Sequence, residues 1–592
     1  MPSARRSAIA IVFAVSVAAC SSGRDPVAAA ETVQATAPAP VDRIGRLAHP
    51  TPYIPPQCYT KTRDDDGRVH NPCFTCHLDA TPPNYLTDRD LQLEYAFGAP
   101  ARTNRWTNLF VDRTAAVAAI PDDEILAYVR RSNYQGPAGD NLVAARVAKM
   151  DPRWDADHDG RWSGWIPDVA FRFDDRGFDR RPDGGYTGWR AFAYYPLPGT
   201  FWPTNGSFGD VLIRLPEPFR QRVDGGFDRA LYEINLAILE ALIARRDVAI
   251  DLTDETGLGV DLDGDGRLAT ARRVRFRASP DGGGLGWVGR AGALQAVRQI
   301  ELATGLFPVG TELAHSVRYI DVDGGRVRMA ARMKELRYMV KERWYSYRVL
   351  QQEAAREVAE DSFDPDAVRP IIASEERGIG NRSGWRLQAF IEDAGGDLRP
   401  QTPEEHGFCI GCHGGIGATD DSVFSFGRKL PSDQRQRGWY HWSEHGLDGV
   451  AEPVRADGQG EYAFYLEQNG AGDELRANRE VQERFFDGAG RLRPEMRALL
   501  ARDVAALLLP GPARGLALDK AYRVIVTEQS FARGRDATIE PAAHVHRTLR
   551  DGDEIATGVV WSVDGPRRGG GFTYPGTPRA RPVAAPLHAP QH

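Results

Sequence analysis

Apolar residues recur at helical intervals in four separate stretches of the chain. Proline and three acids open the first, at residues 121–124, a combination typical of the first turn of a helix. A second apolar stripe runs from 228 to 244, and a third, from 329 to 358, predicts a helix of about thirty residues. The fourth, 494–509, is expected to end at Pro510 because proline cannot continue a helix.

Between residues 186 and 205 the pattern changes to aromatic residues interrupted by glycine and proline. Such punctuation is typical of short strands and ordered loops, and residues 211–215 and 274–276 are predicted as strands. No fixed-period repeat is visible, so a solenoid or propeller is not expected. The sequence therefore predicts a mixed α+β fold with extensive loops.

The two ends of the chain differ from its middle in composition. Alanine and proline dominate from Cys20 to about Pro56, which is typical of a linker. Glycine and proline return from Gly565 onward, which is typical of disorder. We expect a multi-region exported body with these divisions: a signal peptide (1–19), a lipid-anchored linker (20–56), a first motif region (57–150), a strand- and loop-rich middle (151–328), a helical region (329–564) and a disordered tail (565–592).

Two pentapeptides, at residues 73–77 and 409–413, share the pattern C-x-x-C-H. This spacing is typical of covalent haem attachment. The two thiols bond to the vinyl groups of the porphyrin, and the histidine ligates the iron. The sequence therefore predicts two covalently bound haems c, one near the N-terminus and one in the C-terminal third, attached through Cys73, Cys76, His77, Cys409, Cys412 and His413.

Redox dithiols and zinc sites also use paired cysteines. A redox dithiol needs no histidine after it, and zinc needs four converging ligands. Haem is favoured because four of the six cysteines of the chain fall within the two motifs. The motifs and their flanks resemble those of dihaem c-type cytochromes, and this resemblance implies an electron carrier in which protein ligands fill both axial positions of each iron.

The sequence leaves the distal iron ligands open. His70 and His406 each lie three residues before a motif, and we interpret them either as reciprocal ligands, each to the other motif's iron, or as surface histidines. His441 and His445 follow the second motif among aromatic residues and are either its distal ligand or structural histidines. Cys58 is either a thiolate ligand or a buried, inert cysteine.

Two acidic loops share the pattern D-x-D-x-D-G, which opens a calcium-binding loop. Alternate carboxylates suit a hard cation, and the glycine allows a sharp turn. Both loops lack the final glutamate of a complete EF-hand, since Ile166 and Arg272 stand there, so the alternative is a solvated acidic turn. The predicted Ca²⁺ ligands are Asp155, Asp157, Asp159, Asp261, Asp263 and Asp265.

The N-terminal residues predict export and lipid attachment. Arg5 and Arg6 precede an apolar stretch that is too short to span a bilayer. Residues 17–20 resemble the lipobox of bacterial lipoproteins, which makes Cys20 the lipidated residue; the alternative is a plain signal peptide or an uncleaved anchor. Ser21 in place of aspartate favours the outer membrane, and both the periplasm and the cell surface are compatible with this location.

The formal net charge of −7, without a long basic run, makes a nucleic-acid partner unexpected. Redox partner proteins and, through the lipid, a membrane are the expected partners. The favoured function is therefore electron transfer through two haems. Two alternatives stay open: an enzyme resembling dihaem peroxidases or oxygenases, with one open haem iron, and a redox-linked module in which the aromatic middle region binds a partner.

Overall fold

The computed structural model describes the chain in several stretches, which all belong to the second of its two units. The predicted signal peptide, Cys20, and most of the linker and tail lie outside them. The described residues are 54–64, 67–78, 80–86, 97–200, 202–364, 366, 371–470, 478–555, 559–560 and 567–568.

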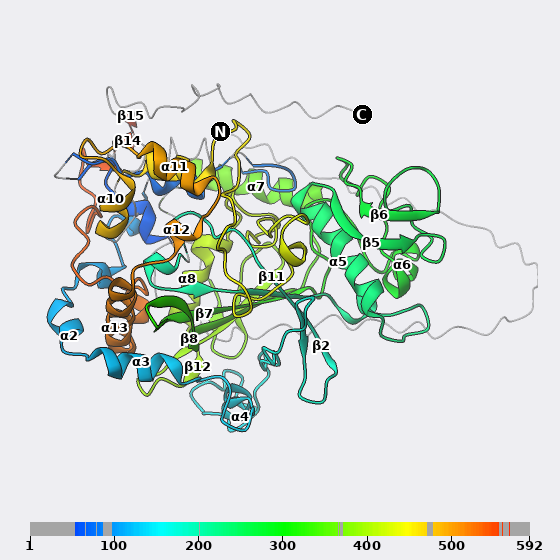
Figure 1. Ribbon diagram of the computed structural model, residues 1–592, viewed down its shortest axis with the longest axis horizontal. Coiled ribbons are helices and arrows are strands. Elements are labelled where there is room, and N and C mark those ends of the chain that lie inside the picture. The colour runs from blue at the N-terminus through cyan, green and yellow to red at the C-terminus, as the bar shows by residue number, and fades with distance from the viewer. Residues whose placement is uncertain are drawn as a thin grey trace, which may run out of the picture. The chain divides into compact units, whose positions relative to one another are not determined.

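An antiparallel sheet organises this unit (Figure 1). Its strand order is β1-β2-β4-β7-β8-β11-β10-β9, while β3 pairs with β7 and β12 pairs with β11. Their bounds are β1 (Phe178–Arg180), β2 (Tyr186–Phe192), β3 (Phe208–Gly209), β4 (Val211–Arg214), β7 (Glu312–Asp323), β8 (Arg326–Lys341), β9 (Ala373–Ser374), β10 (Gly378–Gly380), β11 (Trp385–Glu392) and β12 (Leu398–Pro400).

The long hairpin of β7 and β8 forms the centre of the sheet. Gly324 and Gly325 connect the two strands, and both have positive φ (56° and 78°), as a tight hairpin turn of primed type requires. Leu212, Ala314 and Leu336 lie on one face of the sheet, in a core cluster with Phe390 of β11. The opposite face carries the site described below.

The predicted helix over 329–358 is wrong in its first half, where the chain forms β8. Met333, Leu336 and Val340 fit helical spacing, but β8 is paired on both sides, and these residues belong to or pack against one core cluster. The pairing with β7 shifts register between Val317 and Arg318, so Met333 and Leu336 join the same cluster although they are three residues apart, and the shift interrupts the two-residue alternation of a regular strand. The helix begins only at Tyr347, as α7 (Tyr347–Phe363).

The other helices agree better with the sequence pattern. The stripe over 228–244 is α5 (Arg229–Ala244), and the Asp228 side chain caps it by accepting a hydrogen bond from the Leu231 N–H. The acidic start at 122 opens α3 (Asp122–Arg130). The predicted helix over 494–509 is interrupted, forming α11 (Pro494–Leu500) and α12 (Ala505–Leu508).

The remaining helices are mostly short. None of the helices in the described part of the chain is both long and apolar enough to cross a membrane. Figure 1 shows α13 beside α3 and the β7–β8 hairpin, with which it shares a core cluster. Their bounds are α2 (Thr114–Ala118), α4 (Leu142–Val147), α6 (Gly289–Ala296), α8 (Pro403–His413), α9 (Glu461–Gln468), α10 (Arg479–Phe485) and α13 (Pro512–Glu528).

Two small sheets complete the fold. One pairs β5 (Val248–Asp254) with β6 (Thr270–Val274), and the other contains β13 (Glu554–Ile555), β14 (Val559–Val560) and β15 (Arg567–Arg568). The predicted strand over 211–215 is confirmed as β4. The predicted strand over 274–276 is wrong beyond its first residue, because β6 ends at Val274. The predicted mixture of helices and strands is thus confirmed, with one large sheet at its centre.

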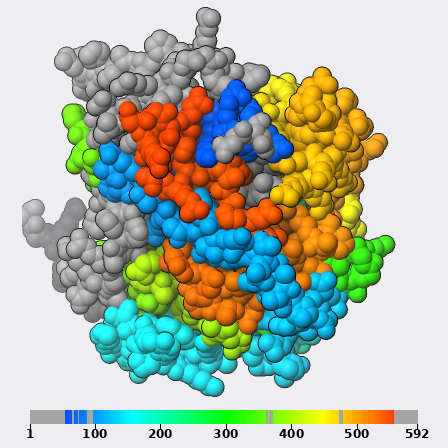
Figure 2. Space-filling view, turned by 90° about the vertical axis from the view of Figure 1, so that its left-hand side faces the viewer, coloured from blue at the N-terminus to red at the C-terminus, as the bar shows by residue number. Residues whose placement is uncertain are grey.

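The two ends of the described chain lie together. Thr60 bridges to Val545 and Lys61 to Ile555, and Tyr59, Trp106 and Leu549 share a core cluster. Figure 2 shows the blue N-terminal segment against the orange-red segment near the C-terminus. This packing anchors the segment that precedes the first C-x-x-C-H motif.

Candidate functional site

Both C-x-x-C-H motifs line one cavity of about 1170 Å³, although they lie far apart in the sequence. The volume exceeds the ~300–1,000 Å³ of a pocket for one drug-sized ligand. One wall is the sheet face that carries residues of β7 and β8, and α7 contributes several further lining residues. Those contributed by the motifs are Cys73, Cys76, His77, Cys409, Cys412 and His413.

The first motif is built on a short 3₁₀ helix, η2 (Pro72–Thr75). The Asn71 side chain caps it by accepting a hydrogen bond from the Cys73 N–H at 3.3 Å. The N–H groups of Cys76 and His77 then donate to the Cys73 carbonyl at 3.1 and 2.9 Å. These turns gather the two thiols and the histidine into one compact group.

The second motif ends helix α8. A capping box of Thr402 and Glu405 fixes the start of that helix. Cys409, Cys412 and His413 follow at i, i+3 and i+4, so their side chains lie on one helical face. The helix therefore presents both thiols and the histidine to the same cavity.

The His413 ring is held in the orientation of a metal ligand. Its Nδ1 lies 2.8 Å from the Ser422 carbonyl oxygen, and since a carbonyl only accepts, Nδ1 carries the proton. The unprotonated nitrogen is therefore Nε2, the tautomer seen in metal-bound histidines. Burial lowers the pKa of His413 to about 4, which keeps the ring neutral near pH 7.

The two motifs are direct neighbours. The Ala418 N–H donates to the Cys76 carbonyl at 3.2 Å, and the Asn84 side chain donates to the Ile416 carbonyl at 3.0 Å. Cys58 also lines the cavity. Burial raises the pKa of its thiol well above the ordinary value, and the nearby Cys73 and Cys412 raise that pKa further.

A buried charge cluster lies in the cavity wall beside the second motif. Glu335 accepts hydrogen bonds from Arg337 at 2.9 Å, from Arg535 at 2.6 Å and from Gln401 at 3.0 Å. Burial alone would raise the pKa of Glu335, but the two guanidinium groups lower it to about 2. The carboxylate is therefore ionised at neutral pH and is a poor proton acceptor.

The structure brings neither His70 nor His406 to the cavity wall. The Nε2 of His70 lies 3.0 Å from Asp64, and its ring stacks on His544 at 4.2 Å. The Nε2 of His406 accepts the Ala389 N–H at 3.1 Å. This arrangement gives the reciprocal ligand pair no support, and both rings have structural partners.

The two histidines downstream of the second motif, His441 and His445, also lie outside the cavity lining. His441 is engaged at both nitrogens, with Asp210 at 2.7 Å and the Ser443 hydroxyl at 2.6 Å, and it borders a separate cavity of about 550 Å³. His445 contacts Arg435 at 3.2 Å. Among the predicted distal ligands, Cys58 alone lies at the cavity.

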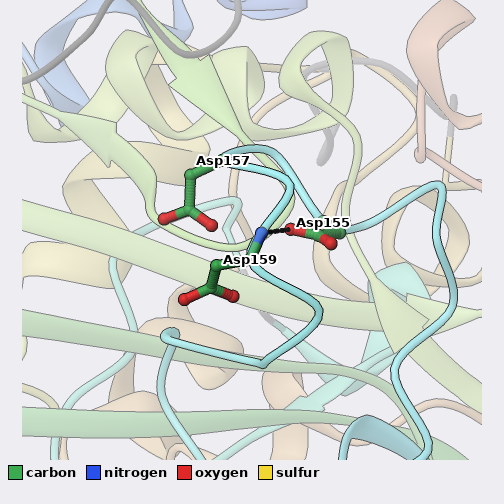
Figure 3. A group of neighbouring side chains, drawn as sticks. All are labelled: Asp155, Asp157 and Asp159. Carbon is green, nitrogen blue, oxygen red and sulfur yellow. Dashed lines mark hydrogen bonds between the residues drawn. The ribbon is translucent and has the colours of Figure 1, made fainter.

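The first acidic loop gathers its three predicted carboxylates, as Figure 3 shows. Oxygen atoms of Asp155, Asp157 and Asp159 lie within 4.8 Å of one another. Asp155 accepts hydrogen bonds from the N–H groups of Asp159 at 3.1 Å and Gly160 at 2.9 Å, and Gly160 has a φ of 74°. Arg377 also pairs with Asp157, at 3.0 Å.

The second acidic loop has the same backbone arrangement but a different set of carboxylates. Asp261 accepts from the N–H groups of Asp265 and Gly266 at 3.2 and 2.9 Å. The clustered carboxylates are those of Glu255, Asp261 and Asp263, so Asp265 does not belong to this group. Sequence reasoning missed Glu255 because it precedes the loop and lies outside the D-x-D-x-D-G pattern.

The fold and the site define a mixed α/β protein in which two C-x-x-C-H motifs share one cavity beside a large antiparallel sheet. A family model for a family of lipoproteins matches residues 41–500. A protein of Aquifex aeolicus (strain VF5) named “Uncharacterized lipoprotein” is 32% identical over 544 residues, which cover 82% of this chain and 86% of the relative. The chain therefore belongs to this lipoprotein family. No solved structure matches it.

These comparisons correct one prediction and support another. The assignment to the dihaem c-type cytochromes is wrong, because both matches are to lipoproteins and neither names a cytochrome. The C-x-x-C-H motifs are too short to define a family by themselves. Membership of a lipoprotein family supports the predicted export and membrane attachment.

Proposed function

We propose that this lipoprotein binds two haems covalently at its C-x-x-C-H motifs and transfers electrons between them and a redox partner protein. The observation that carries the proposal is the meeting of both motifs on one large cavity, with His413 held in the tautomer of an iron ligand. When bound, each haem supplies an iron that accepts and releases one electron.

The residues present fit this group. Cys73 and Cys76 with His77, and Cys409 and Cys412 with His413, provide two thiols and an imidazole at each motif. Apolar and aromatic side chains line the cavity around them, and the burial of a haem is one way in which a protein sets its potential. Those that line the cavity include Trp106, Tyr194, Trp202, Leu313, Met339, Leu387 and Phe408.

The contacts between the two motifs favour direct electron transfer from one haem to the other. The Cys76 carbonyl accepts a hydrogen bond from the segment that follows the second motif, and Cys58 lies close to a thiol of each motif. The two attachment sites therefore belong to one redox unit.

An enzyme with one open iron is the second candidate. The observation in its favour is the charged cluster of Glu335, Arg337 and Arg535 in the cavity wall, whose two guanidinium groups outnumber its one carboxylate and would attract an anion. A change in the haem spectrum on adding peroxide or cyanide to the purified protein would favour this enzyme. Two haems that do not respond would favour the carrier.

We also propose a location at the outer membrane, through lipid on Cys20, and bound Ca²⁺ at the two acidic loops. Ser21 supports the outer-membrane location. The proposal of bound Ca²⁺ is supported by two loops that share the same turn, at each of which three carboxylates cluster. Oxygen ligands of this kind suit a hard cation, and the role expected is structural.

Paired cysteine variants test the proposed function. Redox titration of the wild-type protein should give two one-electron steps in the haem absorption. Cys73→Ser with Cys76→Ser, and separately Cys409→Ser with Cys412→Ser, should each remove one step. Cys58→Ser serves as the control and should retain both haems. Absence of haem from the exported wild-type protein would contradict the proposal.

A further inference from the structure

A second cavity, of about 550 Å³, is lined by other residues than the cavity of the two motifs. Its volume falls within the ~300–1,000 Å³ of a pocket for one small ligand. Among its lining residues are Arg318, His441 and Ser443, and His441 contacts the buried Asp210. A hydroxyl, an imidazole, a carboxylate and a cation therefore meet here, apart from the C-x-x-C-H motifs.

Asp210 fixes one side of this group. It lies between β3 and β4, which both pair with β7, and its carboxylate accepts hydrogen bonds from the Ser316 N–H and hydroxyl, both at 2.6 Å. The Nε2 atom of His441 lies 2.7 Å from the same carboxylate. Burial alone would raise the pKa of Asp210, but the hydrogen bond from His441 holds it well below its ordinary value. An ionised carboxylate only accepts, so Nε2 carries a proton.

The other ring nitrogen of His441 faces Ser443. The backbone N–H of Ser443 donates to Nδ1 at 3.2 Å, and since an N–H only donates, Nδ1 is the unprotonated nitrogen. The Ser443 hydroxyl oxygen lies 2.6 Å from the same Nδ1, so the hydroxyl donates to it. Both sides of the ring thus require one neutral tautomer, and Phe173, stacked on the ring at 4.6 Å, holds its plane.

The three groups differ in their exposure. Ser443 is exposed and lines the cavity, whereas His441 and Asp210 are buried. A hydroxyl hydrogen-bonded to an imidazole, which is oriented in turn by a carboxylate, is the arrangement of an activated nucleophile. It is recognised by this geometry and not by the order of the residues in the chain. The reactive oxygen is therefore the group of the three that a ligand can reach.

Arg318 adds a fixed cation to the same cavity. Its Nε donates to the Ser316 hydroxyl at 2.8 Å and its Nη1 to the Ala331 carbonyl at 2.9 Å. The guanidinium is therefore held in place without a ligand. A positioned cation favours the negative charge that develops on a carbonyl oxygen under attack.

We propose that Ser443, His441 and Asp210 form a triad that hydrolyses a carboxylic ester bound in this cavity. The Ser443 oxygen attacks the carbonyl carbon, its proton passes to Nδ1 of His441, and the ester C–O bond breaks as the alcohol leaves with that proton. Water then attacks the acyl-serine and gives one proton to Nδ1, which returns it to Ser443 as the acid is released. No electron is exchanged, so this activity does not depend on haem.

Diisopropyl fluorophosphate, added to the exported full chain, tests the nucleophile. The Ser443 oxygen should displace fluoride and form one phosphoryl adduct, found by mass spectrometry on the tryptic peptide 438–455, in which Ser443 is the single serine. Ser443→Ala should lose this adduct. Ser132→Ala is the matched control, because Ser132 lies at the same cavity but its hydroxyl oxygen accepts the N–H groups of Tyr134 and Gln135.

Asp210 is a positioning residue, and its test separates rate from affinity. In Asp210→Asn the amide N–H would donate to Nε2 of His441 and move the ring proton to Nδ1, which removes the base. Labelling at saturating probe should slow by about 10⁴-fold, as in other triads, while the probe concentration at half-maximal rate stays the same. An unchanged labelling rate in the folded variant would overturn the role of Asp210.

Hydrolysis of p-nitrophenyl acetate tests the reaction itself. One equivalent of bound phosphoryl group should abolish it in the wild-type protein. Hydrolysis that survives complete labelling, an adduct that forms equally in Ser443→Ala, or a wild-type protein that takes up no phosphoryl group would each overturn the triad.

Discussion

At the scale of single residues, the groups of the C-x-x-C-H motifs are predictable and the groups around them are not. The spacing of Cys409, Cys412 and His413 is local, so the sequence shows it directly. His315 and Glu335 reach the same cavity only through the pairing of β7 and β8. No local pattern distinguishes them from any other histidine or glutamate, which is why sequence reasoning did not select them.

The buried cluster around Glu335 gives a stability prediction. Glu335→Gln leaves Arg337 and Arg535 without their shared carboxylate and should lower the free energy of unfolding by about 3–5 kcal/mol, the range for breaking a buried ion pair. Denaturant unfolding of the full chain measures it. Glu342→Gln, in the more exposed pair with Arg386, should cost less than about 1 kcal/mol.

The same carboxylate predicts a pH dependence. The pKa of Glu335 is lowered from 4.5 to about 2 in the folded protein, so its contribution to stability is present above pH 4.5 and is lost as the pH falls toward 2. The Gln variant should lack this loss. Equal acid sensitivity of the two proteins, or a Glu335→Gln cost no greater than that of Glu342→Gln, would refute the role given to the cluster.

At the scale of elements, helix α5 was predictable and the central strand was not. α5 has a capping aspartate and apolar residues at helical spacing, and both are visible in the sequence. In β8 a register shift in the pairing with β7 interrupts the two-residue alternation, so Met333 and Leu336 imitate helical spacing. The glycine pair at 324–325 was the signal that could have revealed the hairpin.

The acidic loops are the elements that Ca²⁺ should stabilise. Saturating Ca²⁺ should raise the melting temperature, and chelation should lower it, because a ligand that binds only the folded state stabilises that state. Asp263→Ala should weaken calcium binding by calorimetry, whereas Asp265→Ala should bind nearly as well, because Asp265 is not in the carboxylate cluster. Unchanged melting and metal content after chelation would reject the calcium sites.

At the scale of the whole molecule, the meeting of the two motifs depends on the topology of the chain. Each motif was identified from its own residues, but their contact depends on the segment after His413 returning to Cys76, and on the N-terminal segment packing against residues near 545–555. Such long-range packing leaves no periodic signal. The two motifs could not reveal the protein family either. The comparisons showed a lipoprotein family and corrected the cytochrome assignment.

The proposed anchor concerns the molecule's position in the cell. Cys20→Ser should move the protein from the membrane fraction to the soluble fraction, because it removes the residue proposed to carry the lipid. Ser21→Asp should leave it in the membrane fraction but shift it to the inner membrane. Unchanged fractionation of the Cys20 variant would contradict lipid attachment at this residue.

The intact mass of the exported wild-type protein, measured under denaturing conditions, tests the central claim most directly. Covalent attachment predicts a mass increased by two haems over that of the lipidated polypeptide, because thioether bonds survive denaturation. An increase by one haem would exclude one of the two motifs. A mass equal to the lipidated polypeptide alone would contradict the account of this cavity as a redox site.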